Sequence, residues 1–450
     1  MLELPPEEMR RLGYRAIDRL VEHVEVLRDL PPIRLPGPGD LVFAGAPCPD
    51  DPSDPAEALD ALFDEVLAFG MQATHPRMFA RIGSPSTYLG ALAQLASTGV
   101  NAFSASWLGG SGATAVELTV LDWMRGWLGL PTGAEGILVS GGSLGNLTAL
   151  AVAAADRRPD RARATAYVSD QTHATVERAW RVLGFDPAHL RVLRADERQR
   201  LTPPAVRTAL TADRELGLEP FLLVATAGTT STGAVDALPE LADLAAAETV
   251  WLHVDGAYGA FAVLAETGRR ALEGIDRADS VTLDPHKWLF QPYEVGAVLV
   301  RRPGLLESAF SLDGPYLRDH QDGDVQLRNR GLELSRSARG VRIWLSLRVF
   351  GLAAFREAVA RGIALAEHAE SFLRARPGWE VVSPAQLGIV CFRPEEGDVD
   401  EIVARAVGDG FAAPSSTVVG DRVALRLCTI NPRTTFDEIE QTIVRFEELR

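Results

Sequence analysis

The chain has 450 residues, of which 46% are hydrophobic and 24% are charged, a length and composition typical of a globular protein with more than one domain. Its formal net charge of -16 argues against a nucleic-acid partner or an anionic membrane, and no apolar run approaches the roughly 18 residues of a membrane span. The acidic start has no apolar core like that of a secretion signal, and Cys48, Cys391 and Cys428 are too widely spaced for a metal-ligand motif, so we expect a cytoplasmic protein.

Residues 1–83 are expected to form an N-terminal helical segment. Residues 6–30 place apolar side chains at three- and four-residue spacing, which predicts an amphipathic helix. A stretch rich in proline and glycine over residues 31–39 ends this helix, and a second helix is predicted over residues 55–69. Two helices and an extended strap are too small to fold alone, so we expect them to pack against a partner subunit.

The next part, placed at residues 84–347, alternates short apolar stretches with helical ones. The predicted strands are Gly136–Ser140, Thr165–Ser169, Pro220–Thr226, Val250–Asp255, Ser280–Asp284 and Gly296–Val300. Helices are predicted between several of them, for example over Asn146–Arg158 and Leu238–Ala247. Apolar strands joined by helices indicate an α/β domain with a mostly parallel sheet that is covered on both faces.

Polar residues stand at the ends of four of these strands: Ser140, Thr226, Asp255 and Asp284. Ligands of parallel α/β sheets bind at the carboxyl ends of the strands. We therefore expect these residues to converge in space, although they are scattered in the sequence.

The last part, placed at residues 348–450, is predicted to be a smaller α+β domain. A polar stretch over residues 312–331 precedes it and is predicted to be a lid or a disordered insert. The domain's predicted elements are a helix over 352–376, strands over 380–382 and 388–392, a helix over 399–407, and strands over 417–419 and 423–428. A final helix is predicted to begin at Thr435, where Glu438 completes a capping box.

Lys287 is the only lysine in the chain, so the other 44 of the 45 basic residues are arginine. A compositional bias towards arginine explains the 44 arginines but not the retention of one lysine. Arginine stays protonated and cannot act as a nucleophile, whereas a desolvated lysine amine can lose its proton and attack a carbonyl group. Lys287, in the segment Asp284-Pro285-His286-Lys287-Trp288, is therefore a candidate for forming a Schiff base.

The segment Gly141-Gly142-Ser143-Leu144-Gly145-Asn146 follows a predicted strand and opens a predicted helix. Exposed backbone amides, the helix dipole and the Ser143 hydroxyl favour a phosphate site there. The same letters also match the G-x-S-x-G nucleophile elbow of hydrolases, and Asp255 and His286 follow in the matching order Ser, Asp, His. A glycine turn with a purely structural role is a third interpretation.

Asp255 ends a predicted strand and shares one face of it with His253 and Ala257. A carboxylate buried at such a place is costly unless a cation faces it, and a protonated pyridine nitrogen is a suitable cation. An ion pair with one of the many arginines is the structural alternative.

His173 follows another predicted strand at the same sheet edge, where it is either a packed structural residue or a catalytic one. Thr229, Thr230 and Asp236 follow a further strand and either form a turn or add polar groups to the site. A phosphate site, a carboxylate suited to pyridinium and a single amine together predict pyridoxal phosphate (PLP) as the cofactor. A hydrolase needs neither the lone lysine nor the phosphate site.

The chain resembles the group II PLP-dependent decarboxylases, the family of aromatic-L-amino-acid decarboxylase. The resemblance covers nearly the whole chain, through His75-Pro76-Arg77, Glu117 to Trp123, the Gly-Gly-Ser segment, Ser169 to Ala179, His253-Val254-Asp255, and Asp284 to Trp288. It implies PLP fold type I (aspartate aminotransferase-like) and a homodimer with its active site at the subunit interface. It also implies decarboxylation of an L-amino acid to its amine and CO2, and Trp288 after the lysine favours an aromatic substrate.

The resemblance further implies roles for individual residues. Lys287 would carry the cofactor, Asp255 would pair with the pyridine nitrogen, and His173 would stack on the ring. The other expected cofactor contacts are Gly142, Ser143, Thr230, Ala257, Asp284 and His286, and the expected substrate contacts are Ser84, Phe103 and Trp107. No metal is expected.

The chain departs from the family pattern in the lid, where the family's best-known members carry a tyrosine thought to protonate the substrate carbon. Leu327 stands at the matching position, and Tyr316 is the only tyrosine of the lid. We expect His173 or Tyr316 to supply the proton and an amine to be the main product. The alternative is a decarboxylation-dependent aldehyde synthase, in which dioxygen intercepts the unprotonated carbon.

Overall fold

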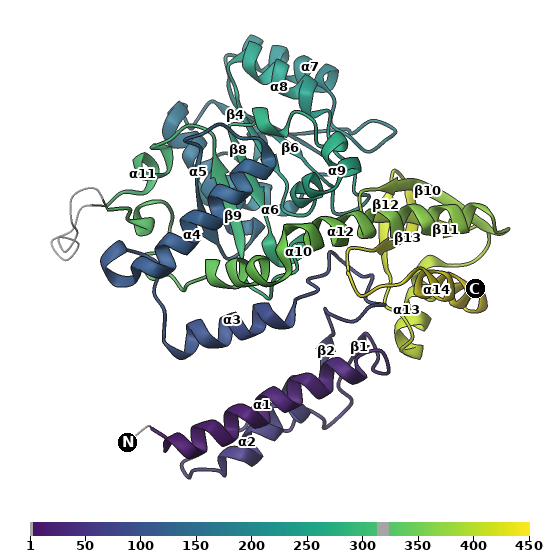
Figure 1. Ribbon diagram of the computed structural model, residues 1–450. Helices are drawn as coiled ribbons and strands as arrows, with labels where there is room; N and C mark the ends of the chain where they lie inside the picture. Colours follow the sequence, from purple (N-terminus) through teal and green to yellow (C-terminus); the bar gives the residue numbers. More distant parts are fainter. Residues whose placement is uncertain (1–2, 313–323) are drawn as a thin grey trace.

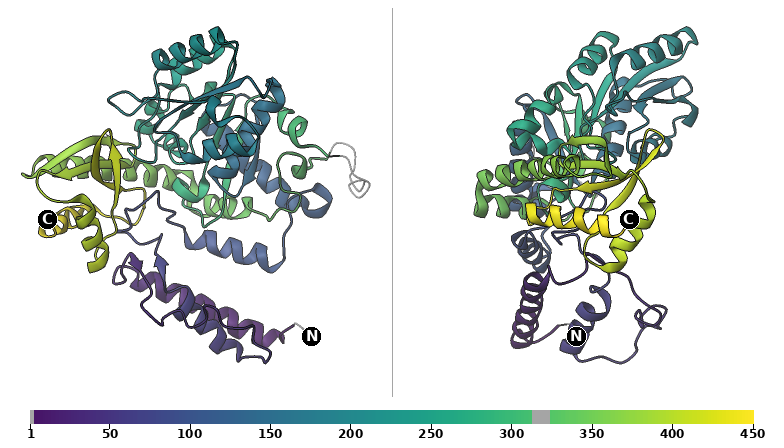
Figure 2. Two further views of the ribbon diagram at one scale, coloured as in Figure 1. Left: turned by 180° about the vertical axis from the view of Figure 1, so that it is seen from behind. Right: turned by 90° about the vertical axis from the view of Figure 1, so that its right-hand side faces the viewer.

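The computed structural model describes residues 3–312 and 324–450, and it comprises an N-terminal helical arm, a large α/β unit and a small C-terminal unit (Figure 1). The arm projects away from the rest of the chain, as the views from behind and from the side also show (Figure 2). The helix α12 (Gly340–Arg374), which bends at Gly351 where φ is 73°, joins the large unit to the small one. It runs across the domain boundary expected after residue 347, so that boundary remains a proposal.

The large unit is built on a seven-stranded sheet with the strand order β3-β9-β8-β7-β6-β4-β5. All of its strands run parallel except β9, which is antiparallel to both of its neighbours. The strands are β3 (Glu135–Val139), β4 (Ala164–Ser169), β5 (Leu190–Leu193), β6 (Glu219–Thr226), β7 (Trp251–Asp255), β8 (Ser280–Leu283) and β9 (Gly296–Val300). The six predicted strands are confirmed, whereas β5 was not predicted because it lies at the sheet edge and no residue in it is fully buried.

Helices cover both faces of this sheet, which confirms the predicted α/β architecture. One face packs against α4, α7, α8 and α12, through side chains such as Val120 and Leu241. The other face packs against α5, α6 and α11, through side chains such as Leu150 and Trp180. The helices of the unit are α3 (Tyr88–Gly99), α4 (Trp107–Leu128), α5 (Gly142–Arg157), α6 (Ala174–Val182), α7 (Pro203–Glu215), α8 (Leu238–Glu248), α9 (Glu266–Ala271), α10 (Pro285–Trp288) and α11 (Leu305–Phe310).

The small unit is an antiparallel sheet with the order β10-β11-β13-β12, covered by helices. Its elements are β10 (Trp379–Gln386), β11 (Ile389–Pro394), α13 (Val399–Asp409), β12 (Ser415–Val419), β13 (Arg422–Cys428) and α14 (Phe436–Glu448). The predicted capping box is present, because the backbone N–H groups of Thr435 and Glu438 each donate to the other residue's side chain. The predicted α+β character of this unit is therefore confirmed.

The arm consists of α1 (Pro6–Val26), β1 (Ile33–Arg34), α2 (Pro55–Ala61) and β2 (Gly70–Met71). The helix predicted over residues 6–30 ends at Val26, and the one predicted over 55–69 changes after Ala61 into a short π-helical segment, Leu62–Val66. Within this chain α1 has no buried residue. Across residues 3–312 and 324–450, no helix combines the length and the apolar character needed to cross a membrane.

Candidate active site

A cavity of about 290 Å³ opens at the carboxyl ends of β3, β6, β7 and β8. It contains every residue for which the sequence predicts a cofactor contact, and it confirms that the four polar strand ends converge. Its lining consists of Ser140, Gly141, Gly142, Ser143, Asn146, His173, Thr175, Thr226, Gly228, Thr230, Asp255, Ala257, Tyr258, Asp284, His286 and Lys287.

The N-terminus of α5 forms one wall of this cavity. No side chain caps the helix, so its first backbone N–H groups are left for a ligand. A Cβ atom added to Gly142 would lie 2.8 Å from Cβ of Ala257 and 3.1 Å from Oδ2 of Asp284, and one added to Gly141 would lie 3.0 Å from Cε1 of His286. The two glycines therefore keep the helix N-terminus open to an anion such as a phosphate.

Lys287 lies on α10, directly after β8, and its Nζ atom is 2.9 Å from Oδ2 of Asp284. Burial lowers the pKa of Lys287, but the carboxylates of Asp284 and Asp255 outweigh that effect, so the pKa lies above its ordinary value. Because 24% of the side chain is exposed, the amine can be reached from the cavity. At neutral pH it is an ammonium group, which must transfer its proton before it can attack a carbonyl group.

His286 does not form the triad that a serine hydrolase needs. Its Nδ1 atom accepts a hydrogen bond from the Val295 backbone at 3.3 Å, and its Nε2 atom lies 3.6 Å from Oδ2 of Asp284. Burial lowers the pKa of His286, although the Asp284 carboxylate opposes this shift. In a triad the third residue orients the histidine, but Asp255 takes its hydrogen bonds from Asn146 and the Ala257 backbone instead.

Asp255 is held rigidly at the end of β7, with 5% of its surface exposed. Its Oδ2 atom accepts a hydrogen bond from Nδ2 of Asn146 at 2.8 Å, and its Oδ1 atom accepts one from the Ala257 backbone at 3.1 Å. Among the described residues no arginine pairs with this carboxylate. The arrangement therefore favours a cationic group of a ligand over the structural ion pair that the sequence left open.

His173 lies just before α6 and accepts hydrogen bonds through Nδ1. The backbone N–H of Thr175 is 3.3 Å from this nitrogen, and Oγ1 of Thr175 is 2.9 Å from it. The carboxylate of Asp236, in contrast, accepts hydrogen bonds from the backbone N–H groups of Leu201 and Thr226, at 2.6 Å each. Burial raises the pKa of Asp236 to about 7.

The cavity fits PLP in three places. The open N-terminus of α5 suits the phosphate, the carboxylate of Asp255 suits the pyridine nitrogen, and the amine of Lys287 suits the aldehyde. Two buried polar atoms at the cavity, Oγ1 of Thr226 and Oδ1 of Asp284, have no hydrogen-bond partner in the described part of the chain. A polar ligand is the expected partner for such atoms.

The three expected substrate residues are not part of the cavity lining. The Ser84 hydroxyl donates to the backbone carbonyl of His286, so it supports the segment that carries Lys287. Trp107 begins α4 and is 37% exposed, and Phe103 pairs with Ser337 in an isolated bridge. Their contact with a substrate remains a proposal.

The structure places the residues considered for proton transfer in different positions. Leu327, at the position of the expected lid tyrosine, is fully buried in the short helical turn Leu327–Asn329 and is not in the lining. Tyr316 lies outside the described residues. His173 is thus the one predicted proton donor that the structure places at the cavity.

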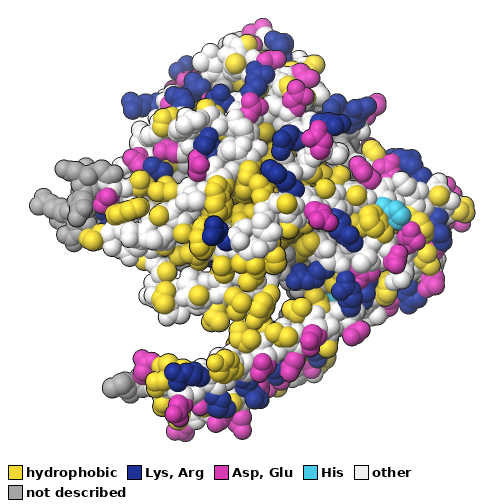
Figure 3. Space-filling model, in the orientation of Figure 1, with side chains coloured by type: hydrophobic (Ala, Val, Ile, Leu, Met, Phe, Trp, Pro, Cys, Tyr) yellow, Lys and Arg dark blue, Asp and Glu magenta, His cyan; other side chains and the backbone are white. Residues whose placement is uncertain are grey.

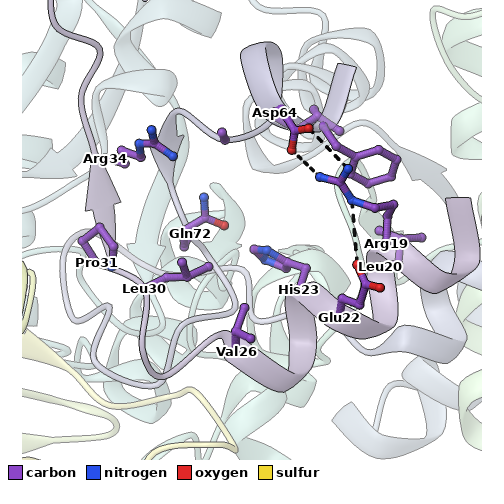
Figure 4. A pocket seen from close by; sticks show the side chains of 13 residues that line it. Arg19, Leu20, Glu22, His23, Val26, Leu30, Pro31, Arg34, Asp64 and Gln72 are labelled. Atoms are coloured by element: carbon purple, nitrogen blue, oxygen red, sulfur yellow. Dashed lines mark hydrogen bonds and ion pairs between the residues drawn. The ribbon is translucent and has the colours of Figure 1, made fainter. Parts of the chain in front are cut away.

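A larger cavity of about 650 Å³ lies within the N-terminal arm, beside α1 (Figure 4). Its labelled side chains include His23 and Glu22 of α1, and the Arg19 guanidinium in it pairs with Asp64. The cavity has no lysine, and no long helix presents a free N-terminus to it. Residues of the arm itself enclose this cavity, with α1 on one side and the segment that includes Phe63 and Gln72 on the other, and the cavity lacks the groups that PLP requires.

Sequence reasoning missed three side chains of the active-site cavity: Asn146, Thr175 and Tyr258. The Tyr258 hydroxyl accepts a hydrogen bond from the Gly388 backbone at 2.9 Å, and its ring stacks on Trp288 with centroids 5.2 Å apart. Asn146 and Thr175 each follow a recognised motif residue by two or three positions. Helical spacing from Ser143 could have suggested Asn146, whereas nothing in the sequence pointed to Tyr258.

The comparison with known proteins agrees with this geometry. The model of the pyridoxal-dependent decarboxylase conserved domain matches residues 44–395. An aromatic-L-amino-acid decarboxylase from Bacillus atrophaeus is 44% identical, over 100% of this chain and 96% of that protein. A phenylacetaldehyde synthase from Arabidopsis thaliana is 30% identical, over 97% of this chain and 94% of that protein.

Solved structures give the same result. The crystal structure of Oryza sativa TDC with PLP and tryptamine matches this structure with a TM-score of 0.94 and 27% identity, covering 100% of this chain and 99% of that one. Fold type I and the PLP cofactor, both expected from the sequence, are thereby confirmed. The chain belongs to the pyridoxal-dependent decarboxylase family.

Proposed function

We propose that this enzyme removes the carboxylate of an aromatic L-amino acid and releases the amine and CO2. The observation that carries the proposal is that the chain's one lysine, Lys287, lies in the same cavity as Asp255 and the open N-terminus of α5. The aromatic class is supported by the 44% identical aromatic-L-amino-acid decarboxylase, whose alignment spans the whole chain.

The residues of the cavity have separate roles in the proposed reaction. The N-terminus of α5, with Ser143, would hold the phosphate, and Lys287 would hold the cofactor through its amine. When bound, the cofactor supplies an acceptor for the electron pair that the departing carboxylate leaves behind. Asp255 supplies the negative charge that keeps the pyridine nitrogen protonated, and that protonation makes the acceptor effective.

After CO2 leaves, a proton must reach the substrate carbon. We assign this step to His173, whose Nδ1 atom is occupied by Thr175, which leaves Nε2 as the nitrogen that faces other partners. A second proton donor, Tyr316, remains part of the proposal.

An aldehyde synthase is the second candidate, and one observation favours it. Leu327, which cannot donate a proton, occupies the position at which a tyrosine was expected, and it is fully buried. One of the similar proteins, 30% identical to this chain, is named a phenylacetaldehyde synthase. We nevertheless favour the amine, because His173 stands at the cavity and the aromatic-L-amino-acid decarboxylase relative is more similar.

We further propose that the enzyme works as a homodimer whose N-terminal arms embrace the partner subunit. The arm leaves apolar side chains of α1 uncovered, among them Tyr14, Val21 and Val24, which are 41–68% exposed. Apolar side chains also gather on the face of the body that looks towards the arm, with a hollow between the two (Figure 3). A second copy of the chain would fill this hollow and bury both surfaces.

The cytoplasm is the compartment that we propose. Cys48, Cys391 and Cys428 are all free thiols, and burial raises the pKa of Cys391 to about 12. Free thiols of this kind are typical of a reducing compartment.

A substrate panel tests the proposed reaction. The PLP-loaded enzyme is incubated with each aromatic L-amino acid and with glutamate, and amine, aldehyde and CO2 are quantified by mass spectrometry. We expect amine and CO2 in equal amounts from at least one aromatic substrate and none from glutamate. CO2 release from glutamate alone would show that the assignment to aromatic substrates is wrong.

A further inference from the structure

Asn146, in the second turn of α5, connects two residues on different walls of the active-site cavity. Its Nδ2 atom donates a hydrogen bond to Oδ2 of Asp255 at 2.8 Å and another to Oγ1 of Thr175 at 3.1 Å. The residue is 1% exposed, so water cannot replace these partners readily. Both amide hydrogens are therefore committed, one to each wall.

A series of hydrogen bonds leads from Trp251 through Ser280 and His253 to Asn146, and each residue in it donates to the next. Nε1 of Trp251 can only donate, and it donates to Oγ of Ser280 at 2.9 Å. The Ser280 hydroxyl is thereby directed to donate to Nδ1 of His253 at 2.9 Å, and Nε2 of His253 donates to Oδ1 of Asn146 at 3.1 Å. At the far end the carboxylate of Asp255 can only accept, so the direction is set from both ends.

This direction requires a neutral His253 whose proton is on Nε2. Burial lowers the pKa of His253 to about 4, so the ring is neutral at physiological pH. A neutral ring anchors the amide of Asn146 without placing a positive charge beside Asp255. The carboxylate thus keeps its charge for a cation in the cavity.

Asn146 is also linked to His173, through the side chain of Thr175. Oγ1 of Thr175 accepts from Asn146, so its own hydrogen points to Nδ1 of His173 at 2.9 Å. The Thr175 backbone N–H donates to the same nitrogen at 3.3 Å. With Nδ1 accepting twice, the proton of a neutral His173 is on Nε2.

We infer that Asn146 is a positioning residue that orients Asp255 towards the cofactor's pyridine nitrogen and, through Thr175, sets the tautomer of His173. The inference rests on the proposed function, because it takes the PLP ring to lie between these two contacts. His253, Ser280 and Trp251 hold the amide in the one orientation that serves both branches.

Cofactor affinity tests the inference without recourse to turnover. The apoenzyme is titrated with PLP and with 1-deaza-PLP, in which carbon replaces the pyridine nitrogen, and binding is followed by tryptophan fluorescence. Asn146→Ala removes a hydrogen bond to a charged group, so it should weaken PLP binding about tenfold or more. The affinity for 1-deaza-PLP should stay within about twofold of the wild-type value, because that analogue has no nitrogen for Asp255 to meet.

Two further variants separate positioning from packing. Thr148→Val, on the same helix, alters a buried hydroxyl group that has no hydrogen-bond partner among the described residues, so it should leave both affinities unchanged. His253→Leu should reproduce the selective loss of PLP affinity, and His253→Gln should restore part of it, because a glutamine amide can still donate to Asn146.

The outcomes are distinct. If Asn146→Ala lost affinity for PLP and for 1-deaza-PLP equally, the residue would have a packing role and the inference would be overturned. An unchanged affinity for PLP would also overturn it. A wild-type apoenzyme that binds neither compound would instead contradict the proposed function itself.

Discussion

The Nζ atom of Lys287 lies 2.9 Å from Oδ2 of Asp284, which comes three residues earlier in the chain. Asp284 is 1% exposed, so its carboxylate depends on this ammonium group for a counter-charge. The residue that we propose to attack the cofactor's aldehyde is therefore held in its protonated, unreactive form by its own neighbour. Lys287 must therefore transfer its proton to another group before its amine can attack the aldehyde.

Replacing Asp284 with Asn should lower the pKa of Lys287, because burial, which lowers it, would then act with less opposition. The pH profile for capture of PLP by the apoenzyme should shift to lower pH, as followed by the absorbance of the bound cofactor in a stopped-flow instrument. Asp279→Asn, at the opposite end of β8, is the matched control and should leave the profile in place. An unchanged or higher midpoint in Asp284→Asn would contradict this account.

The same pair makes the stability of the apoprotein depend on pH. Folding raises the pKa of Lys287, so the stabilisation is complete below the ordinary lysine pKa of about 10.4 and is lost as the pH rises through the higher folded value. The melting temperature of the wild-type apoprotein should fall more steeply above pH 10 than that of Asp284→Asn. Parallel curves in scanning calorimetry would show that the pair contributes nothing.

Asp255 should be needed for turnover even when the cofactor site is saturated with PLP. At saturating PLP, Asp255→Ala should still carry the cofactor on Lys287 but should lower kcat by about 10²–10³-fold, because the charge that stabilises the protonated pyridine nitrogen is gone. Asp255→Asn should fall between Ala and wild type, since an amide can hydrogen-bond but carries no charge. Near-normal kcat in Asp255→Ala would remove this residue from the mechanism.

The sequence predicted those residues of the site whose type and position along the chain indicate a particular chemical role. Lys287 stood out as the one lysine, Gly141 and Gly142 as an anion site, and Asp255 as a carboxylate at a strand end. Strand alternation also placed His253 on the same face as Asp255, and both contact Asn146 in the structure. These residues were predictable because local geometry determines where they point.

Contacts that depend on tertiary packing were not predictable. Tyr258 reaches the Gly388 backbone, 130 residues away, and no local pattern indicates that partner. The edge strand β5 is short and only half-buried, so its sequence lacks the apolar run that revealed the other strands. The first helix ends at Val26 rather than near residue 30, because helix ends are set by local turns that periodicity does not resolve.

The choice between amine and aldehyde should depend on His173. If His173 supplies the proton to the substrate carbon, His173→Gln should lower the rate of amine formation by about 10²–10⁴-fold and raise the share of aldehyde formed in air. Product analysis in air and under argon measures both effects, with Tyr316→Phe assayed in parallel. Unchanged amine formation in both variants would mean that another group donates the proton.

A buried ion pair should secure the segment that precedes α12. Arg336 and Glu117 are 2.5 Å apart with both side chains fully buried, and Arg336 also donates to the carbonyls of Ser104 and Leu138. Glu117→Ala should lower the free energy of unfolding by about 3–5 kcal/mol, because it leaves a buried guanidinium unpaired. In chemical denaturation the double variant Glu117→Met/Arg336→Leu should lose less than the sum of its single variants, and additivity would contradict the pairing.

The most direct test of the central claim is to locate the cofactor on the chain. The yellow PLP-loaded enzyme is reduced with borohydride and digested, and its peptides are analysed by mass spectrometry. We expect the mass of reduced pyridoxal phosphate on Lys287, since the chain offers no other lysine. A colourless protein with unmodified Lys287, and with Ser143 labelled by a fluorophosphonate, would contradict the account.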